Sequence, residues 1–159
     1  MKTLILYATK HGATREIARR IADRMDGAAL YDLKQGGVPA LSEFDCVIVG
    51  SPVYAGTIRK EVKAFVSQNA SALQGKRLGL FLSGMSADKE KEVFDANFPP
   101  DILQSAKTAS NLGYIFNPAN AGFMERFIMK AIAKQSGYLE NIDDGKIEQF
   151  AEAVKHDEL

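Results

Sequence analysis

Short apolar runs alternate along this chain with segments whose apolar residues recur at helical spacing, and this alternation limits the folds open to it. Runs typical of strands occur at 4–7, 28–33, 44–49, 78–82 and 110–116, and the continuous apolar run at 4–7 is typical of a strand covered on both faces. Helical spacing indicates helices at 14–25, from 58 to about 70, and at 88–94, 123–135 and 146–155. Strands that alternate with helices build parallel sheets covered by helices on both faces. We therefore predict an α/β fold with a doubly wound, five-stranded parallel sheet in the order 2-1-3-4-5.

The length and charge balance of the chain exclude several classes of protein. Its 159 residues fit one domain, 1–159, with 46% hydrophobic and 25% charged residues, as in ordinary globular proteins. Twenty basic and twenty acidic residues cancel, whereas nucleic-acid-binding domains show a basic surplus. The single cysteine, Cys46, lies in an apolar run, so we expect a buried side chain and not a nucleophile, and no Cys/His cluster offers a metal site. With a strand near its first residue and no apolar stretch of about 20 residues, the protein is expected to be cytoplasmic.

The first strand turns into the first helix through a loop that suits an anion. The N–H groups that open a helix lack intrahelical acceptors and lie at the positive end of the helix dipole. Together with two threonine hydroxyls, these groups favour a phosphate. His11 either donates to that phosphate or lies in solvent. The candidate phosphate-binding residues are Thr9, Lys10, His11, Gly12, Ala13 and Thr14.

Other kinds of phosphate site require residues that this turn lacks. The nucleotide P-loop needs G-x-x-x-x-G-K-[ST], the dinucleotide fingerprint needs G-x-G-x-x-G, and neither pattern is present. A phosphatase of this architecture would need a cysteine in the turn, and a receiver domain would need acidic residues where this chain has Lys10 and His11. From these residues alone, an ordinary capped strand-to-helix turn remains the alternative.

The T-x-x-G-x-T pattern of this loop resembles the FMN-phosphate loop of flavodoxins, [ST]-x-T-G-x-T, with His11 in place of the middle threonine. The segment G-S-P-x-Y-x-G at 50–56 is similar to the loop that cradles the flavin ring in flavodoxin-domain proteins. The resemblance implies a flavodoxin-like fold, an FMN cofactor and chemistry at flavin N5, with no catalytic side chain required. It also implies ring contacts from the loops after strands three and four. Those residues are Ser51, Pro52, Val53, Tyr54, Ala55, Gly56, Ser83, Gly84 and Met85.

A further segment, R-F-I-M-K-x-I-x-K-x-S-G at 126–137, looks like the menaquinone-dependent protoporphyrinogen dehydrogenase family. This resemblance implies an FMN-dependent oxidoreductase that passes electrons from a porphyrinogen to a quinone. Where that family carries an arginine- and aromatic-rich loop after strand five, this chain has Asn-Pro-Ala-Asn-Ala-Gly at 117–122, so the small-molecule reductant stays open. The alternatives are an electron carrier for redox protein partners and a flavodoxin-fold binding module without a cofactor.

A basic stripe lies on the segment expected to form the helix at 123–135. Arg126, Lys130 and Lys134 repeat every four residues beside a broad apolar face. The stripe is either the solvent-facing side of a packing helix or a peripheral contact with acidic lipid head groups at the inner face of the membrane.

Overall fold

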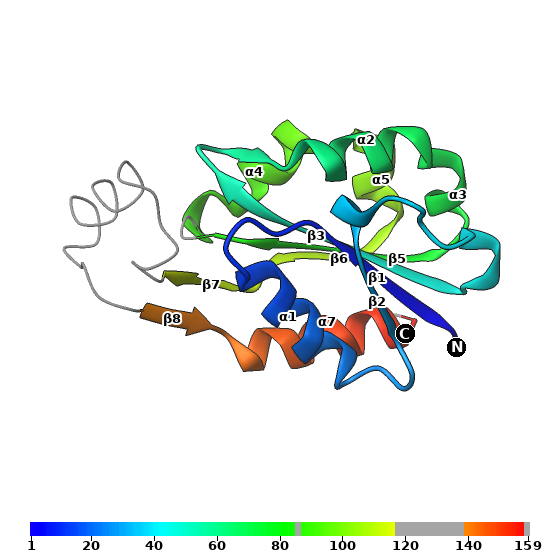
Figure 1. Cartoon of the computed structure of the whole chain (residues 1–159), viewed down its shortest axis with the longest axis horizontal. Helices are drawn as coiled ribbons and strands as arrows, with labels where there is room; N and C mark the ends of the chain where they lie inside the picture. Colours follow the sequence, from blue (N-terminus) through cyan, green and yellow to red (C-terminus); the bar gives the residue numbers. More distant parts are fainter. Residues whose placement is uncertain (85–86, 117–138, 158–159) are drawn as a thin grey trace.

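The computed structural model describes residues 1–84, 87–116 and 139–157. Five parallel strands form its main sheet: β1 (Thr3–Tyr7), β2 (Ala29–Asp32), β3 (Cys46–Tyr54), β5 (Arg77–Ser83) and β6 (Ala106–Asn111). Their order across the sheet is β2-β1-β3-β5-β6 (Figure 1). The predicted α/β architecture and the strand order 2-1-3-4-5 are therefore confirmed.

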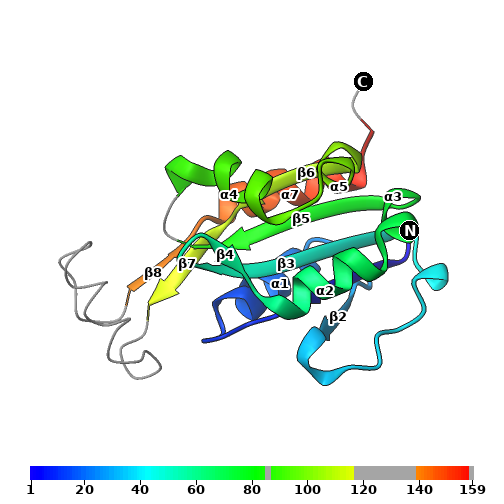
Figure 2. The ribbon, with the colours of Figure 1, turned by 90° about the horizontal axis from the view of Figure 1, so that it is seen from above.

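Helices cover both faces of this sheet. On one face lie α1 (Ala13–Ala22) and α7 (Asp144–Lys155), and on the other lie α2 (Lys60–Gln68), α3 (Ala70–Gln74), α4 (Glu90–Asn97) and α5 (Pro100–Ser105) (Figures 1 and 2). Alternate strand residues point to opposite faces, so Leu4 and Leu6 pack toward α2–α5, while Ile5 packs toward α1 and α7. This double burial explains why the sequence of β1 is continuously apolar. In the part of the chain that the structure describes, three short 3₁₀ turns lie in the connections: η1 (Leu33–Gln35), η2 (Leu41–Glu43) and η3 (Ala87–Lys89).

The segment after β3 forms a hairpin that the sequence did not predict. β3 continues past the expected strand end to Tyr54, and β4 (Thr57–Ile58) pairs back antiparallel to it. Both residues of the intervening turn have positive φ, 51° at Ala55 and 75° at Gly56, as a type I′ hairpin turn requires. The helix that was expected to start at Ile58 consequently begins at Lys60.

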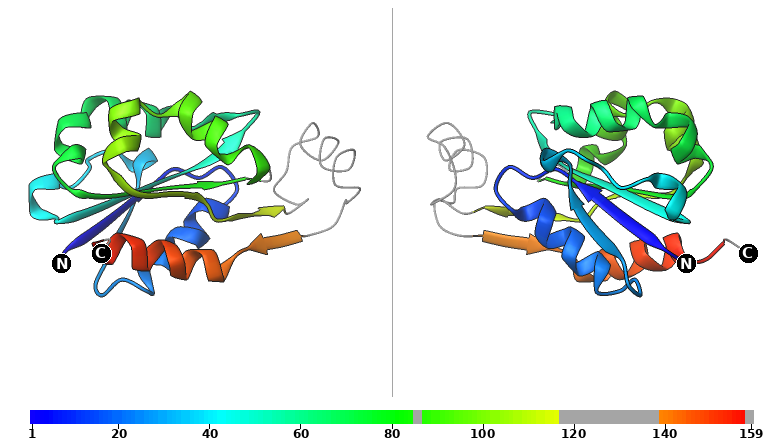
Figure 3. Two further views of the ribbon diagram at one scale, coloured as in Figure 1. Left: turned by 180° about the vertical axis from the view of Figure 1, so that it is seen from behind. Right: turned by 45° about the vertical axis from the view of Figure 1, so that its right-hand side comes forward.

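The prediction that 110–116 forms the fifth parallel strand is wrong. The strand beside β5 is the polar segment Ala106–Asn111, while the apolar residues after it form β7 (Gly113–Phe116), which pairs antiparallel with β8 (Leu139–Ile142). An edge strand tolerates polar residues because one of its sides has no neighbouring strand to bury it. The chain leaves the sheet at Gly113, whose φ of 120° and close approach to the Asn141 carbonyl admit no side chain. The β7–β8 ribbon extends beyond the end of the main sheet (Figure 3).

Candidate functional site

Three loops leave the sheet from its adjacent central strands at the same edge. Tyr7, the last residue of β1, lies beside Gly50 of β3, and Pro52 of β3 lies beside Ser83, the last residue of β5. The carboxyl ends of these strands lie together at the left of Figure 1. This edge is where open α/β sheets place their ligands.

The first loop, at 8–14, leads into the amino end of α1. The hydroxyl oxygen of Thr9, a buried residue, accepts a hydrogen bond from the N–H of Gly12 (2.9 Å), and this bond folds the loop back on itself. Gly12 is the N-cap residue of α1, with a left-handed φ of 95°. The first i→i−4 bond of the helix runs from Glu16 N to Gly12 O (3.0 Å), so the N–H groups of residues 13–15 have no acceptor within the helix. These amides are the donors that an anion would use.

Thr14 adds a buried hydroxyl to this helix end. The residue has no exposed surface, and its Oγ1 has no hydrogen-bond partner within the parts of the chain that the structure describes. A buried hydroxyl without a partner costs free energy, because it has lost its bonds to water. An acceptor at the opening of α1 would remove that cost. Thr14 therefore fits a phosphate group at this position.

The second loop is the β3–β4 hairpin, and it contacts the first. The ammonium of Lys10 lies 4.3 Å from the centroid of the Tyr54 ring, within the range of a cation–π interaction. Tyr54 is 47% exposed, an unusual position for a large aromatic side chain. The N–H of Ala8 also donates to Gly50 O (3.2 Å). The two loops thus form one continuous surface.

Ser51 and Gly50 support the hairpin from inside. The Ser51 side chain is fully buried, donates to Pro52 O (2.9 Å) and accepts from Arg59 N (2.9 Å). Gly50 has an ordinary φ, and its role is steric: a Cβ there would lie 2.0 Å from the Phe81 ring. Gly56, by contrast, has a positive φ of 75°, the left-handed conformation that glycine adopts readily.

The third loop follows β5 and lies against the second. Ser83 is buried, and a Cβ at Gly84 would approach the Val53 side chain to 3.3 Å. Met85 lies outside the described residues. The structure therefore brings together the predicted residues at 9–14, 51–56 and 83–84.

Two asparagines that the sequence analysis did not single out hold these loops. Asn97, the last residue of α4, bonds to Gly56 O and Ile58 N of the hairpin. Asn111, the last residue of β6, bonds to Gly84 O of the third loop. The available signal was the position of each amide at the end of an element, where side chains often bond to backbone groups.

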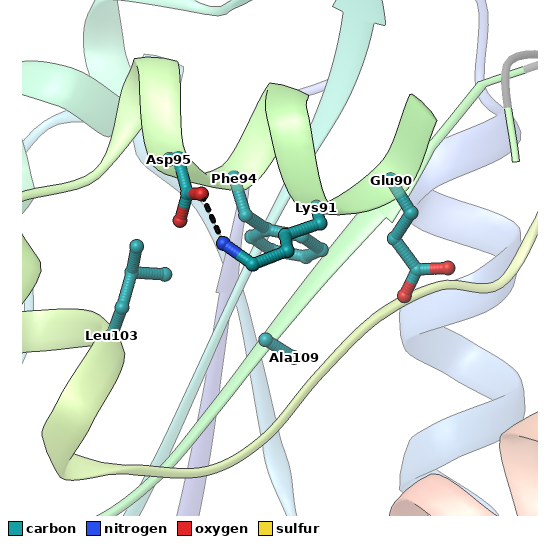
Figure 4. Close-up of a pocket in the computed structure, with 6 residues that line it drawn as sticks. All are labelled: Glu90, Lys91, Phe94, Asp95, Leu103 and Ala109. Carbon is teal, nitrogen blue, oxygen red and sulfur yellow. Dashed lines mark hydrogen bonds and ion pairs between the residues drawn. The ribbon is translucent and has the colours of Figure 1, made fainter. Parts of the chain in front are cut away.

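A shallow hollow of about 370 Å³ lies elsewhere, on the outer side of α4 between α5 and β6. Figure 4 shows Lys91 and Asp95 paired across it, with Phe94 behind them. No residue predicted for the site lines this hollow. Its lining residues are Glu90, Lys91, Phe94, Asp95, Leu103 and Ala109.

Neither a reactive cysteine nor a metal-binding cluster occurs among the described residues. Cys46 is buried as expected, and burial raises the pKa of its thiol to about 11, so the side chain is protonated at neutral pH. Across residues 1–84, 87–116 and 139–157, no group of three or more His, Cys, Asp or Glu side chains could hold a metal ion. None of the described helices has the length and apolar character needed to cross a membrane.

Comparison with known proteins agrees with this fold. The family described as Flavodoxin domain matches residues 4–143. Protoporphyrinogen IX dehydrogenase [quinone] of Escherichia coli (strain K12) is 26% identical over 156 residues, covering 86% of this chain and 81% of that protein.

Two solved structures are similar over nearly their whole lengths. A short-chain flavodoxin associated with a non-canonical PDU bacterial microcompartment has a TM-score of 0.61 and 17% identity, with 98% of this chain and 97% of that chain covered.

The other solved structure is a mutant of Fusobacterium nucleatum flavodoxin bound to flavin mononucleotide. It has a TM-score of 0.53 and 17% identity, with 97% of this chain and 95% of that chain covered. The family match spans most of the chain, and both solved structures share its overall fold. The chain belongs to the flavodoxin domain family.

Proposed function

We propose that this protein binds FMN at the three clustered loops. The observation that carries the proposal is the buried hydroxyl of Thr14 at the opening of α1, which has no hydrogen-bond partner among the described residues. It lies beside helix amides that have no intrahelical acceptor. In this assignment Thr9–Thr14 hold the phosphate, and Tyr54 lies against the ring. The family match and the FMN in the Fusobacterium structure support the same cofactor.

The protein's part in the chemistry is to bind and orient the cofactor. FMN, when bound, supplies electron and hydride transfer at its ring. The helix amides neutralise the phosphate charge, and Lys10 adds a positive charge at the junction of the first two loops. The hairpin and Gly84 present backbone groups and apolar surface to the ring, and such groups tune its electron affinity.

We further propose that the protein is an oxidoreductase that couples a small-molecule reductant to a quinone. The Escherichia coli relative named as a quinone-linked dehydrogenase supports this reaction class. The balance of twenty basic and twenty acidic residues also favours small-molecule chemistry, because electron carriers commonly use a strongly charged surface to meet their partners. A carrier for redox proteins is the second candidate, favoured by the overall likeness to flavodoxins.

A purified sample separates these candidates. We expect a yellow protein, or a colourless one that becomes yellow and quenches flavin fluorescence when FMN is added. We then expect steady oxidation of a supplied reductant with menadione as the acceptor. A protein that binds FMN yet reduces only redox proteins would be a carrier, and failure to bind FMN would overturn the whole assignment.

The location of the protein stays a prediction from the sequence: cytoplasmic, with Arg126, Lys130 and Lys134 forming either a solvent-facing stripe or a peripheral membrane contact. These three residues lie outside the described residues. The test is sedimentation with anionic vesicles, for which we expect weaker binding after Lys130→Glu and Lys134→Glu. Unchanged binding would assign the stripe to a solvent-facing helix surface.

A further inference from the structure

Helix α4 is bonded at its carboxyl end to the β3–β4 hairpin. The side-chain amide of Asn97 donates to Gly56 O (2.9 Å) and to Val93 O (2.8 Å), and its oxygen accepts from Ile58 N (3.2 Å). One side chain thus joins the last turn of α4 to backbone groups on either side of Thr57. These bonds fix the turn that carries Tyr54.

The amino end of the same helix is bonded to the third loop through Asn111. Glu90 extends from the first turn of α4 toward β6, as Figure 4 shows, and its carboxylate accepts from Asn111 N (3.2 Å). The Asn111 side chain, only 6% exposed, donates to Gly84 O (3.1 Å) and accepts from Gly113 N (3.1 Å). Bonds of this kind are strong constraints, because a buried amide that loses its partner is costly.

Between these two ends, α4 is fixed to the core. Phe94 is 4% exposed and packs with Phe98 at a ring-centroid distance of 5.7 Å. An α-helix of this length spans about 12 Å and does not stretch. The hairpin and the third loop are therefore both held by one rigid helix, α4.

We propose that α4 sets the separation of the two loops that border the flavin ring, with Asn97 and Asn111 as positioning residues. The inference rests on the proposed FMN site, since the ring is what the two loops would enclose. In this proposal α4 controls how closely the two loops contact the ring, and through these contacts it influences the reduction potential of the flavin. The phosphate contacts belong to the first loop, and none of the hydrogen bonds described for α4 reaches that loop.

The first experiment compares Asn97→Ala with Asn69→Ala. Asn69 follows the last residue of α2, and its side chain donates to Phe65 O (2.9 Å), the same i−4 bond that Asn97 makes to Val93. None of its described hydrogen bonds reaches a ring-side loop. The probes are FMN and riboflavin, which share the ring and differ in the phosphate. We expect Asn97→Ala to raise the dissociation constants of both flavins by about tenfold, because the hairpin loses the two hydrogen bonds that position it. The midpoint potential and the visible circular dichroism of bound FMN should shift as well. Asn69→Ala should leave all of these unchanged, and equal effects of the two variants would overturn the proposal.

The second experiment tests the loops without any flavin. In the flavin-free protein, hydrogen exchange of the amides at 55–58 should rise in Asn97→Ala and not in Asn69→Ala. Asn111→Ala should raise exchange at 84 and 113. Unchanged exchange overturns the positioning role even if FMN binds, whereas wild-type protein that fails to bind FMN overturns the proposed function and leaves this result intact.

The third experiment tests the shared element. If both loops act on one ring through α4, the affinity lost in the double variant Asn97→Ala/Asn111→Ala will be less than the product of the two single losses. Strictly multiplicative losses would mean that the loops act separately, and α4 would then have no common role.

Discussion

The ammonium of Lys10, in the loop after β1, lies 4.3 Å from the centroid of the Tyr54 ring, in the hairpin after β3. A cation at that distance is attracted by the ring, and the contact joins the loop assigned to the phosphate with the loop assigned to the flavin ring. The charge of Lys10 can therefore attract the phosphate, while its contact with Tyr54 can influence the flavin ring. The two flavins FMN and riboflavin separate these roles.

Lys10→Met should weaken the binding of FMN much more than the binding of riboflavin. The substitution keeps an unbranched side chain that is only one atom shorter and removes its charge. A charge-assisted hydrogen bond contributes about 1.5–3 kcal/mol, so we expect the FMN dissociation constant to rise by about tenfold or more. Fluorescence titration measures both flavins, with the exposed α2 residue Lys63→Met as the control. Equal losses for FMN and riboflavin would assign Lys10 to the ring instead.

Thr14→Val should move stability and affinity in opposite directions. The two side chains have nearly the same shape, and valine removes the buried hydroxyl that has no described partner. We expect the flavin-free protein to keep its stability or to gain about 1 kcal/mol. FMN affinity should fall by about tenfold, with riboflavin unaffected. Urea unfolding and flavin titration measure the two quantities. A clear loss of stability without flavin would mean that the hydroxyl already has a partner in the folded protein.

Gly50→Ala should destabilise the fold by overpacking. The new methyl group would meet the Phe81 ring at 2.0 Å, so either the ring or β3 must shift, at a cost of about 1–3 kcal/mol. Denaturant unfolding measures the loss. Phe81→Leu introduced into the same chain should restore part of it, because the smaller side chain vacates the space. An alanine variant as stable as the wild type would contradict the steric role of Gly50.

Glu16 should stabilise the protein at neutral pH and lose this contribution in acid. It accepts hydrogen bonds from Arg19 and Arg20, and these guanidinium groups hold the pKa of its carboxyl below the ordinary value of 4.5. A carboxyl with a lowered pKa binds fewer protons when folded than when unfolded, so its contribution is complete above pH 4.5 and declines as the pH falls through the folded pKa. Thermal unfolding across pH 2–6 should therefore show a shallower decline for Glu16→Gln. The exposed η2 residue Glu43→Gln is the control, and equal curves for both variants would contradict the assignment.

The main features of the fold could be predicted from periodicity alone. Continuous apolar runs indicated β1, β3 and β5, and helical spacing indicated α1 and α7, because burial on both sheet faces or on one helix face demands those patterns. The loop residues Thr9–Thr14 were also visible, since capping residues at a strand-to-helix turn have a local cause. The hairpin was missed because positive φ at Ala55 is rare for a residue with a side chain and leaves no mark in the sequence.

The sequence by itself determined where most strands and helices lie and in what order they follow, because the spacing of apolar residues in each segment reflects the faces that it must bury. Only the tertiary structure decided which segment forms the edge strand beside β5. The polar segment Ala106–Asn111 takes the edge, and the more apolar β7 pairs with β8 instead, because an edge position is set by hydrogen bonding to β5 and not by hydrophobicity. Tertiary structure also decided the partners of Asn97 and Asn111, since the carbonyls they bind belong to other elements and no local pattern connects them.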